Sequence, residues 1–155
     1  YSNRRLHHAG LMTSSPRSPF SISHDARSSA RERALHVLYE AQAKTSAGHT
    51  VVEAQVLPVD DMAVDIVAGV DEHQPSLDGF IEQNLIGWTL ARMPIIDLII
   101  LRIATFELVH RWSVPRAVVI NEAVELAKRF STEESGRFIN GVLSAIAKDV
   151  RANQQ

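Results

Sequence analysis

The stretch IIDLIILRIATFELV, residues 95–109, is apolar on nearly every side of a helical wheel, with Asp97 and Arg102 as charged exceptions. Pro94 precedes it and is tolerated in the first turn of a helix, where its missing N–H is not needed. A helix without a polar face normally runs through the middle of a bundle, because no side of it is suited to water. The stretch therefore predicts the central helix of a helical protein.

The same stretch does not have the pattern of a membrane span. The apolar run from Met93 to Val109 contains three charged residues and is shorter than the roughly 20 residues that a spanning helix needs. Near the start of the chain, Arg4 and Arg5 are not followed by an apolar segment, so no secretory signal is expected. The chain has no cysteine, which agrees with a reducing compartment. We therefore expect a cytoplasmic protein without a membrane segment.

Helical patterns continue on both sides of the central stretch. Val114-Pro115 places an extended residue before the next helix, and Thr132 can cap the last one, with acidic residues in its first turn. Upstream, Gln74-Pro75 is expected to divide a long apolar pattern into two helices. The expected helices lie at 30–43, 59–73, 76–85, 95–109, 116–130 and beyond Thr132. The chain is thus predicted to be all-α, with about six or seven helices.

Residues 1–28 differ from the rest in composition. They are rich in Ser, Arg, His and Pro and lack apolar periodicity, so they predict a disordered tail. Residues 29–152 are expected to form the helical domain. Up to Lys44 the chain holds seven basic and three acidic residues, a charge of +4, against nine and fifteen afterwards, a charge of −6. A basic head indicates binding to a polyanion, although arginines of a solvated tail would give the same count.

The sequence carries no pattern typical of catalysis. It has neither a Gly-rich phosphate loop nor a Gly-x-Ser-x-Gly elbow. Glu107 and His110 form one Glu-x-x-His pair, whereas a di-iron bundle needs two such pairs and two further glutamates. These two residues are expected near the exposed end of their helix. We therefore predict a protein that is not an enzyme and uses no metal or other cofactor.

Four blocks together resemble a known family. ARERALHVLY (residues 30–39), LRIATFEL (101–108), VINEAVELAK (119–128) and ESGRFINGVL (134–143) occur in this order and at suitable distances. They are similar to the NusB family of bacterial transcription antitermination factors, over roughly residues 29–150. GWTL at residues 87–90 looks most like actinobacterial members.

The resemblance implies a function as well as a fold. It implies two small helical bundles and a complex with NusE, the ribosomal small-subunit protein that also acts in transcription. The pair would bind boxA RNA in leader transcripts of ribosomal RNA and help RNA polymerase resist termination. A homodimeric interaction module with weak RNA binding remains an alternative. A fused RNA-modifying enzyme does not fit, because 155 residues without a cofactor loop leave no room for a catalytic domain.

The resemblance also implies an RNA-binding site at the head of the first helix. Arg27, Arg31 and Arg33 match the family's arginine-rich start, where side chains and the helix N-terminus can contact phosphates. Ser28 and Ser29 interrupt this run, so tight RNA binding without the partner is not expected. Phe138 matches the surface near the RNA, although its apolar spacing would equally suit a core residue.

Two further positions are implied to face NusE. Tyr39 lies at the edge of the apolar stripe of the first helix, where its ring can pack and its hydroxyl can reach out. Asp97 is the acidic residue in the first turns of the apolar helix and is expected on its open side. We predict that both side chains lie on one exposed surface.

Overall fold

The computed structural model describes residues 19–152, which form α-helices and one short 3-10 helix, without a strand in that part of the chain. The elements are α1 (Pro19–Lys44), α2 (Gly48–Glu53), α3 (Asp61–Gln83), η1 (Leu90–Arg92), α4 (Ile95–His110), α5 (Arg116–Phe130) and α6 (Glu133–Val150). The all-α prediction is confirmed, and so is the expected number of helices. The prediction of disorder for residues 1–18 concerns a segment outside the described residues.

Helix α4 is the centre of the fold, as its sequence predicts. Its residues 97–108 are all buried, and the helix contacts α1, α3, α5 and α6. Burial of each Leu, Ile or Phe side chain stabilises the folded state by about 1.5–3 kcal/mol relative to exposure. This helix therefore supplies a large share of the core.

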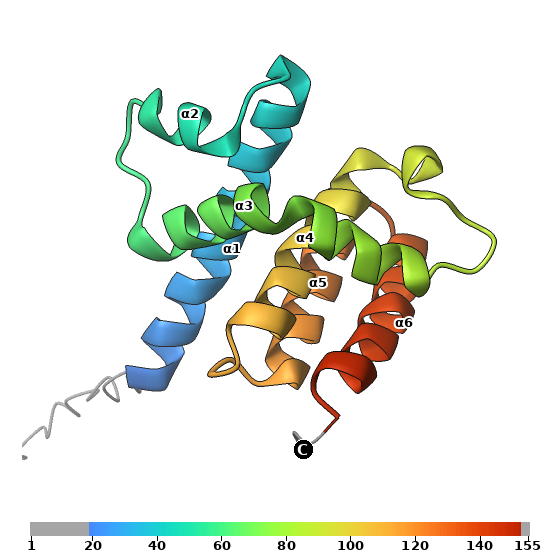
Figure 1. Cartoon of the computed structure of the whole chain (residues 1–155). Helices are drawn as coiled ribbons and strands as arrows, with labels where there is room; N and C mark the ends of the chain where they lie inside the picture. Colours follow the sequence, from blue (N-terminus) through green and yellow to red (C-terminus); the bar gives the residue numbers. More distant parts are fainter. Residues whose placement is uncertain (1–18, 153–155) are drawn as a thin grey trace, which may run out of the picture.

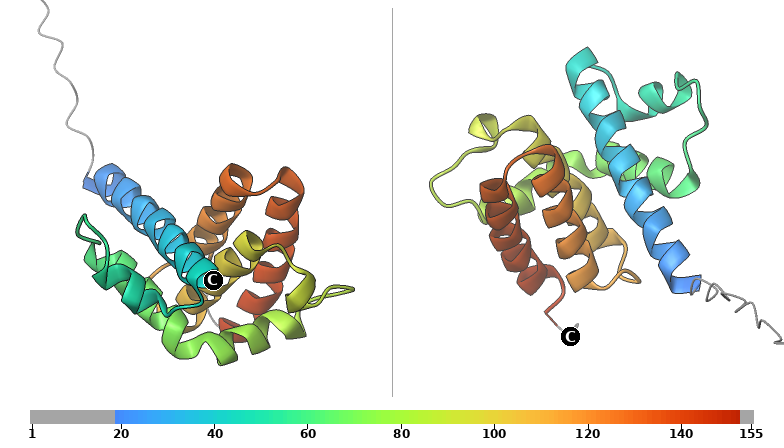
Figure 2. Two further views of the ribbon diagram at one scale, coloured as in Figure 1. Left: turned by 90° about the horizontal axis from the view of Figure 1, so that it is seen from above. Right: turned by 180° about the vertical axis from the view of Figure 1, so that it is seen from behind.

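The helices form two small groups that share α3 and α4. Helices α1 and α2 pack with α3, while α5 and α6 pack with α4 and with each other (Figure 1). Figure 2 shows α3 passing beneath both groups, from the side of α2 to the side of α6. In agreement with Figures 1 and 2, α3 contacts both α4 and α6.

The expected break at Pro75 is wrong. Helix α3 continues through Pro75, which is exposed. A proline inside a helix removes one backbone hydrogen bond, yet contacts beyond it hold the chain in place. Leu77 and Ile81 are fully buried there, and Arg102 donates two hydrogen bonds to the carboxylate of Asp78, at 2.8 and 3.0 Å. Tertiary packing thus overrides the local signal.

The first helix also begins earlier than the sequence suggested. Helix α1 starts at Pro19, so residues 19–28 are helical instead of belonging to a disordered tail. Proline is well suited to the first helical position. The Ser28 hydroxyl donates a hydrogen bond of 2.8 Å to Glu122 in α5. This contact ties the turn of α1 that contains Ser28 to α5.

Helices α5 and α6 follow the sequence closely. Helix α5 has the expected bounds, and Thr132 caps α6 by accepting a hydrogen bond of 2.9 Å from the Ser135 N–H. Near the end of α5, the guanidinium of Arg129 donates two hydrogen bonds to Glu32 in α1, at 2.9 and 3.1 Å.

Candidate nucleic-acid and partner interface

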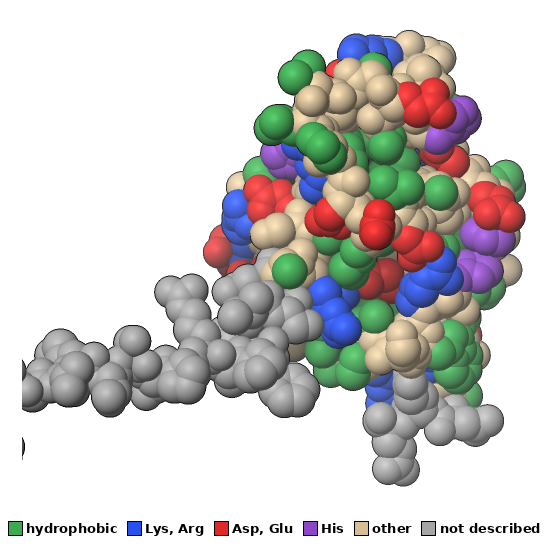
Figure 3. All heavy atoms as spheres, turned by 90° about the vertical axis from the view of Figure 1, so that its left-hand side faces the viewer, with side chains coloured by type: hydrophobic (Ala, Val, Ile, Leu, Met, Phe, Trp, Pro, Cys, Tyr) green, Lys and Arg blue, Asp and Glu red, His purple; other side chains and the backbone are tan. Residues whose placement is uncertain are grey.

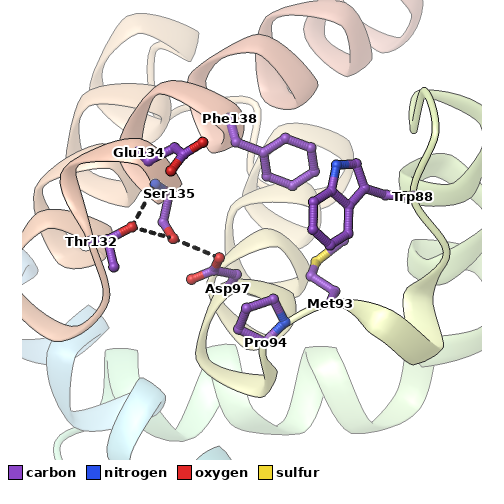
Figure 4. A pocket seen from close by; sticks show the side chains of 8 residues that line it. All are labelled: Trp88, Met93, Pro94, Asp97, Thr132, Glu134, Ser135 and Phe138. Atoms are coloured by element: carbon purple, nitrogen blue, oxygen red, sulfur yellow. Dashed lines mark hydrogen bonds between the residues drawn. The ribbon is translucent and has the colours of Figure 1, made fainter.

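An open pocket of about 220 Å³ lies between the start of α4, the start of α6 and the loop that precedes η1 (Figure 4). Two aromatic rings flank one end of it, Phe138 from α6 and Trp88 from the loop before η1. The ring centroids of Trp88 and Phe138 are 6.2 Å apart, and their planes are inclined by 54°. Within residues 19–152, the lining consists of Trp88, Met93, Pro94, Asp97, Thr132, Glu134, Ser135 and Phe138.

The other side of the pocket is polar and ordered by hydrogen bonds. The Ser135 hydroxyl donates to one oxygen of Asp97 at 2.8 Å and accepts from the Thr132 hydroxyl at 3.0 Å (Figure 4). These bonds connect the first turn of α4 with the cap of α6. They fix the polar wall of the pocket relative to α6, the helix that carries Phe138.

Asp97 lies in this wall and does not have the exposure that we expected. Only 3% of the residue is exposed, because it sits between the starts of α4 and α6. Its Oδ2 accepts the bond from Ser135, whereas Oδ1 is buried without a hydrogen-bond partner. The prediction that Asp97 occupies the open side of its helix is therefore wrong. Its carboxylate nevertheless keeps one acceptor unused.

Phe138 combines the two roles between which the sequence could not decide. The side chain is partly buried and packs against the hydrophobic core, and it also lines the pocket. Trp88 was not predicted as a site residue, because GWTL was used only as a mark of the family resemblance. In the structure, Trp88 is 52% exposed. Phe138 is therefore not the only aromatic residue available at this surface.

Arg31 is the clearest correction to the expected RNA-binding site. It is 1% exposed, and its guanidinium donates to both oxygens of Glu107, at 2.8 and 2.9 Å. Glu107 is itself 2% exposed and not near an exposed helix end. A guanidinium held in this way cannot also contact a phosphate. The spacing of the arginines on α1 points Arg31 into the core, where the acid of α4 neutralises it.

The other two arginines remain nearer to the surface. Arg27 is exposed, whereas Arg33 is half-buried and donates a hydrogen bond of 3.0 Å to the side chain of Gln55. On the face shown in Figure 3, Lys and Arg side chains are interspersed with acidic and apolar ones and form no continuous basic area. Of Arg27, Arg31 and Arg33, only Arg27 is thus exposed.

A second hollow, which we call the Tyr39 groove, lies beside the pocket. It measures about 210 Å³ and is lined by Leu35, His36, Tyr39, Ile96 and Phe130. Tyr39 is 47% exposed, as predicted. The imidazole of His36 packs edge-on against Phe130, with 5.2 Å between the ring centroids.

The groove and the pocket meet in the first turn of α4. Ile96 lines the groove, and the next residue, Asp97, lines the pocket. Among the described residues, no group of three or more His, Asp or Glu side chains is placed to hold a metal ion. No helix in the same part of the chain is long and apolar enough to cross a membrane.

Comparisons with known proteins agree with this architecture. The model of the NusB family matches residues 28–148. The transcription antitermination protein NusB of Acidothermus cellulolyticus is 48% identical over 135 residues, which cover 83% of this chain and 89% of that protein. The protein of the same name from Arthrobacter sp. is 45% identical over 125 residues, with coverages of 78% and 92%.

Two solved structures extend the comparison to three dimensions. A structure of T. maritima NusB superposes with a TM-score of 0.72 at 31% identity, covering 79% of this chain and 91% of that one. A structure of antitermination factors NusB and NusE in complex with dsRNA contains a similar chain, with a TM-score of 0.69 and 30% identity. It covers 79% of this chain and 96% of that one.

Proposed function

This chain belongs to the NusB family, and from that premise we propose that it is a transcription antitermination factor that binds RNA together with NusE. Its RNA target is the boxA element of ribosomal RNA leader transcripts, and the complex helps RNA polymerase resist termination. The chain acts by binding, without catalysis or a cofactor, in the cytoplasm where bacterial transcription takes place. The solved complex of a relative with NusE and dsRNA supports both partners.

The observation that carries this proposal is the position of the Tyr39 groove beside the aromatic pocket. The groove is almost entirely apolar, which suits a protein partner, and the pocket offers aromatic rings, which suit unstacked bases. Because Ile96 and Asp97 are consecutive, NusE in the groove would lie next to RNA in the pocket. Such a composite site lets the partner contribute to RNA affinity.

Tyr39 and Asp97 have different roles in this arrangement. Tyr39 presents an exposed ring and hydroxyl to NusE. Asp97 was also expected to face NusE, but its Oδ1 is buried and its side chain lines the pocket instead of the groove. We therefore assign it a positioning role, in which it holds the Ser135 hydroxyl and joins the start of α4 to the start of α6.

The RNA side of the site has few phosphate contacts. Arg27 and Arg33 are its candidates, since Arg31 is engaged with Glu107. At ~0.7 per contact for single strands, the two contacts give a slope of about −1.4 for log affinity against log salt. This weak dependence fits a protein that binds RNA poorly without its partner.

A titration of boxA RNA tests the proposed function. Affinity is measured for boxA and for a scrambled RNA of equal length, first with this protein and then with equimolar NusE. We expect the mixture to discriminate between the two RNAs much more strongly than this protein by itself. Equal discrimination in both cases would exclude the composite site, and no preference for boxA in the mixture would exclude the proposed function.

The competing proposal of a homodimeric module is tested by light scattering. The Tyr39 groove is apolar enough to be covered by a second copy, and of Arg27, Arg31 and Arg33 only Arg27 is exposed. A monomer that forms a 1:1 complex with NusE supports the lead proposal. A stable homodimer that excludes NusE supports the alternative.

A further inference from the structure

Trp88 stands opposite Phe138 without any contribution to the core that would explain its position. The indole is half exposed, and among the described residues its N–H has no hydrogen-bond partner. Both rings line the same pocket (Figure 4). A large aromatic side chain that faces water beside another ring is more typical of a binding surface than of packing.

The two walls of this pocket differ in rigidity. Phe138 belongs to α6 and packs against the core, so its position is fixed by the helix. Trp88 lies in the loop between α3 and η1, directly after Gly87, whose φ is +74°. Nothing lies within 4 Å of a Cβ built on Gly87, and Ile86 is 92% exposed. The Trp88 wall can therefore adjust while the Phe138 wall stays in place.

The spacing of the rings is slightly too small for a flat group between them. A base stacked on both rings needs about 7 Å, which is two contact distances of ~3.5 Å. The centroids are 6.2 Å apart and the planes are inclined by 54°. To form a slot with two parallel walls, Trp88 must therefore move outward and its ring must also turn by about the 54° that now separates the two planes.

The chemistry of the lining favours a base over a phosphate. Among the residues that the structure describes, no Lys or Arg lines the pocket, and Glu134 would repel a phosphate. Stacking on aromatic rings is the usual way in which proteins hold unpaired RNA bases. The hydroxyl of Thr132 and the carboxylate of Glu134 can form hydrogen bonds to the edge of such a base.

We propose that Trp88 is the second wall of a slot that holds one unpaired RNA base against Phe138. This inference rests on the proposed function, because the RNA brings the base to the slot. Trp88 thus determines the affinity for single-stranded RNA at this position, whereas Arg27 and Arg33 contact phosphates elsewhere.

Tryptophan fluorescence and affinity together test the slot. Trp112 is the other tryptophan and is exposed to a similar extent, 50%, so Trp112→Phe serves as the matched control and leaves Trp88 as the sole reporter. In this background, titration with single-stranded boxA RNA in the presence of NusE should change the Trp88 emission. The midpoint should equal that of an anisotropy titration with labelled RNA.

The affinity of the variants supplies the second readout. Loss of one stacked base weakens binding about five- to 150-fold, which is the expected effect of Trp88→Ala. Trp88→Phe should restore most of the affinity, and Trp112→Phe should leave it unchanged. Thermal unfolding and NusE binding of Trp88→Ala should match the unchanged protein, which excludes a folding defect.

The outcomes separate this inference from the proposed function. If the unchanged protein with NusE binds boxA but Trp88→Ala binds equally well, the slot is refuted and the antitermination function stands. If Trp88→Ala weakens binding to single-stranded and fully duplex RNA alike, stacking of an unpaired base is also refuted. If the unchanged protein with NusE shows no preference for boxA, the proposed function itself fails.

Discussion

Removal of one partner from the buried pair of Arg31 and Glu107 should strongly destabilise the fold. The guanidinium donates to both carboxylate oxygens, and the two residues are 1% and 2% exposed. They join α1 to α4 across 76 positions of sequence. If Arg31 is replaced by Met, the carboxylate of Glu107 stays in the core without its counterion.

The expected magnitude follows from desolvation. Breaking a buried ion pair by removing one partner lowers the free energy of unfolding by about 3–5 kcal/mol. Domains of this size have about 5–15 kcal/mol in total, so Arg31→Met should lose a large fraction of its stability. The double variant Arg31→Met with Glu107→Leu leaves no uncompensated charge. It should recover most of the loss, because an apolar pair of similar volume is often neutral or stabilising.

Urea denaturation followed by circular dichroism measures these effects. The two single variants and the double variant give a double-mutant cycle, in which the coupling free energy should be several kcal/mol. RNA binding by Arg31→Met is measured with NusE at a low temperature, at which the variant is still folded. The slope of log affinity against log salt should equal that of the unchanged protein. The reasoning is refuted if the single variant is as stable as the unchanged protein, or if its salt slope drops by about 0.7, the value of one phosphate contact.

Three further predictions concern other parts of the molecule. Gly69→Ala should destabilise the protein by about 1–3 kcal/mol in thermal unfolding, because the added Cβ would overlap the buried ring of Phe106. Gly79→Ala is the control, since it lies in the same helix with open space around it and should be neutral or stabilising. Tyr39→Ala should weaken NusE binding by at least ~1 kcal/mol in calorimetry without a change in melting temperature, and an unchanged affinity would contradict the role of the Tyr39 groove. Burial and neighbouring positive charges lower the pKa of His110 in the folded protein, so the unfolded state binds the proton more readily. The neutral His110 therefore contributes fully to the free energy of unfolding above pH ~6.5. This contribution decreases as the pH falls from there toward the folded-state pKa. Melting temperatures between pH 7.5 and 5 should show this decrease, which should be smaller in His110→Gln.

Local chemistry in the sequence determined the second half of the fold. The bounds of α5 and the cap of α6 follow from residues within one helical turn, namely Pro115 at the start of the one and Thr132 at the start of the other. The central position of α4 follows from the apolar residues on nearly every side of this helix, since only a helix surrounded by other helices can bury all of its sides. Three of the four family motifs lie in α4, α5 and α6, and the fourth lies in α1, so the resemblance to NusB could be read without coordinates.

Contacts between distant residues decided what the sequence could not. Helix α3 continues through Pro75 because Arg102 and the core hold the following turns, and Arg31 is buried because Glu107 approaches it from another helix. The pairing of Trp88 with Phe138 likewise joins a loop to a helix 50 positions later. Sequence patterns report the periodicity of one segment, whereas the free energy of a buried charge or an aromatic pair depends on which side chain the fold brings opposite to it. Only the tertiary structure determines that neighbour.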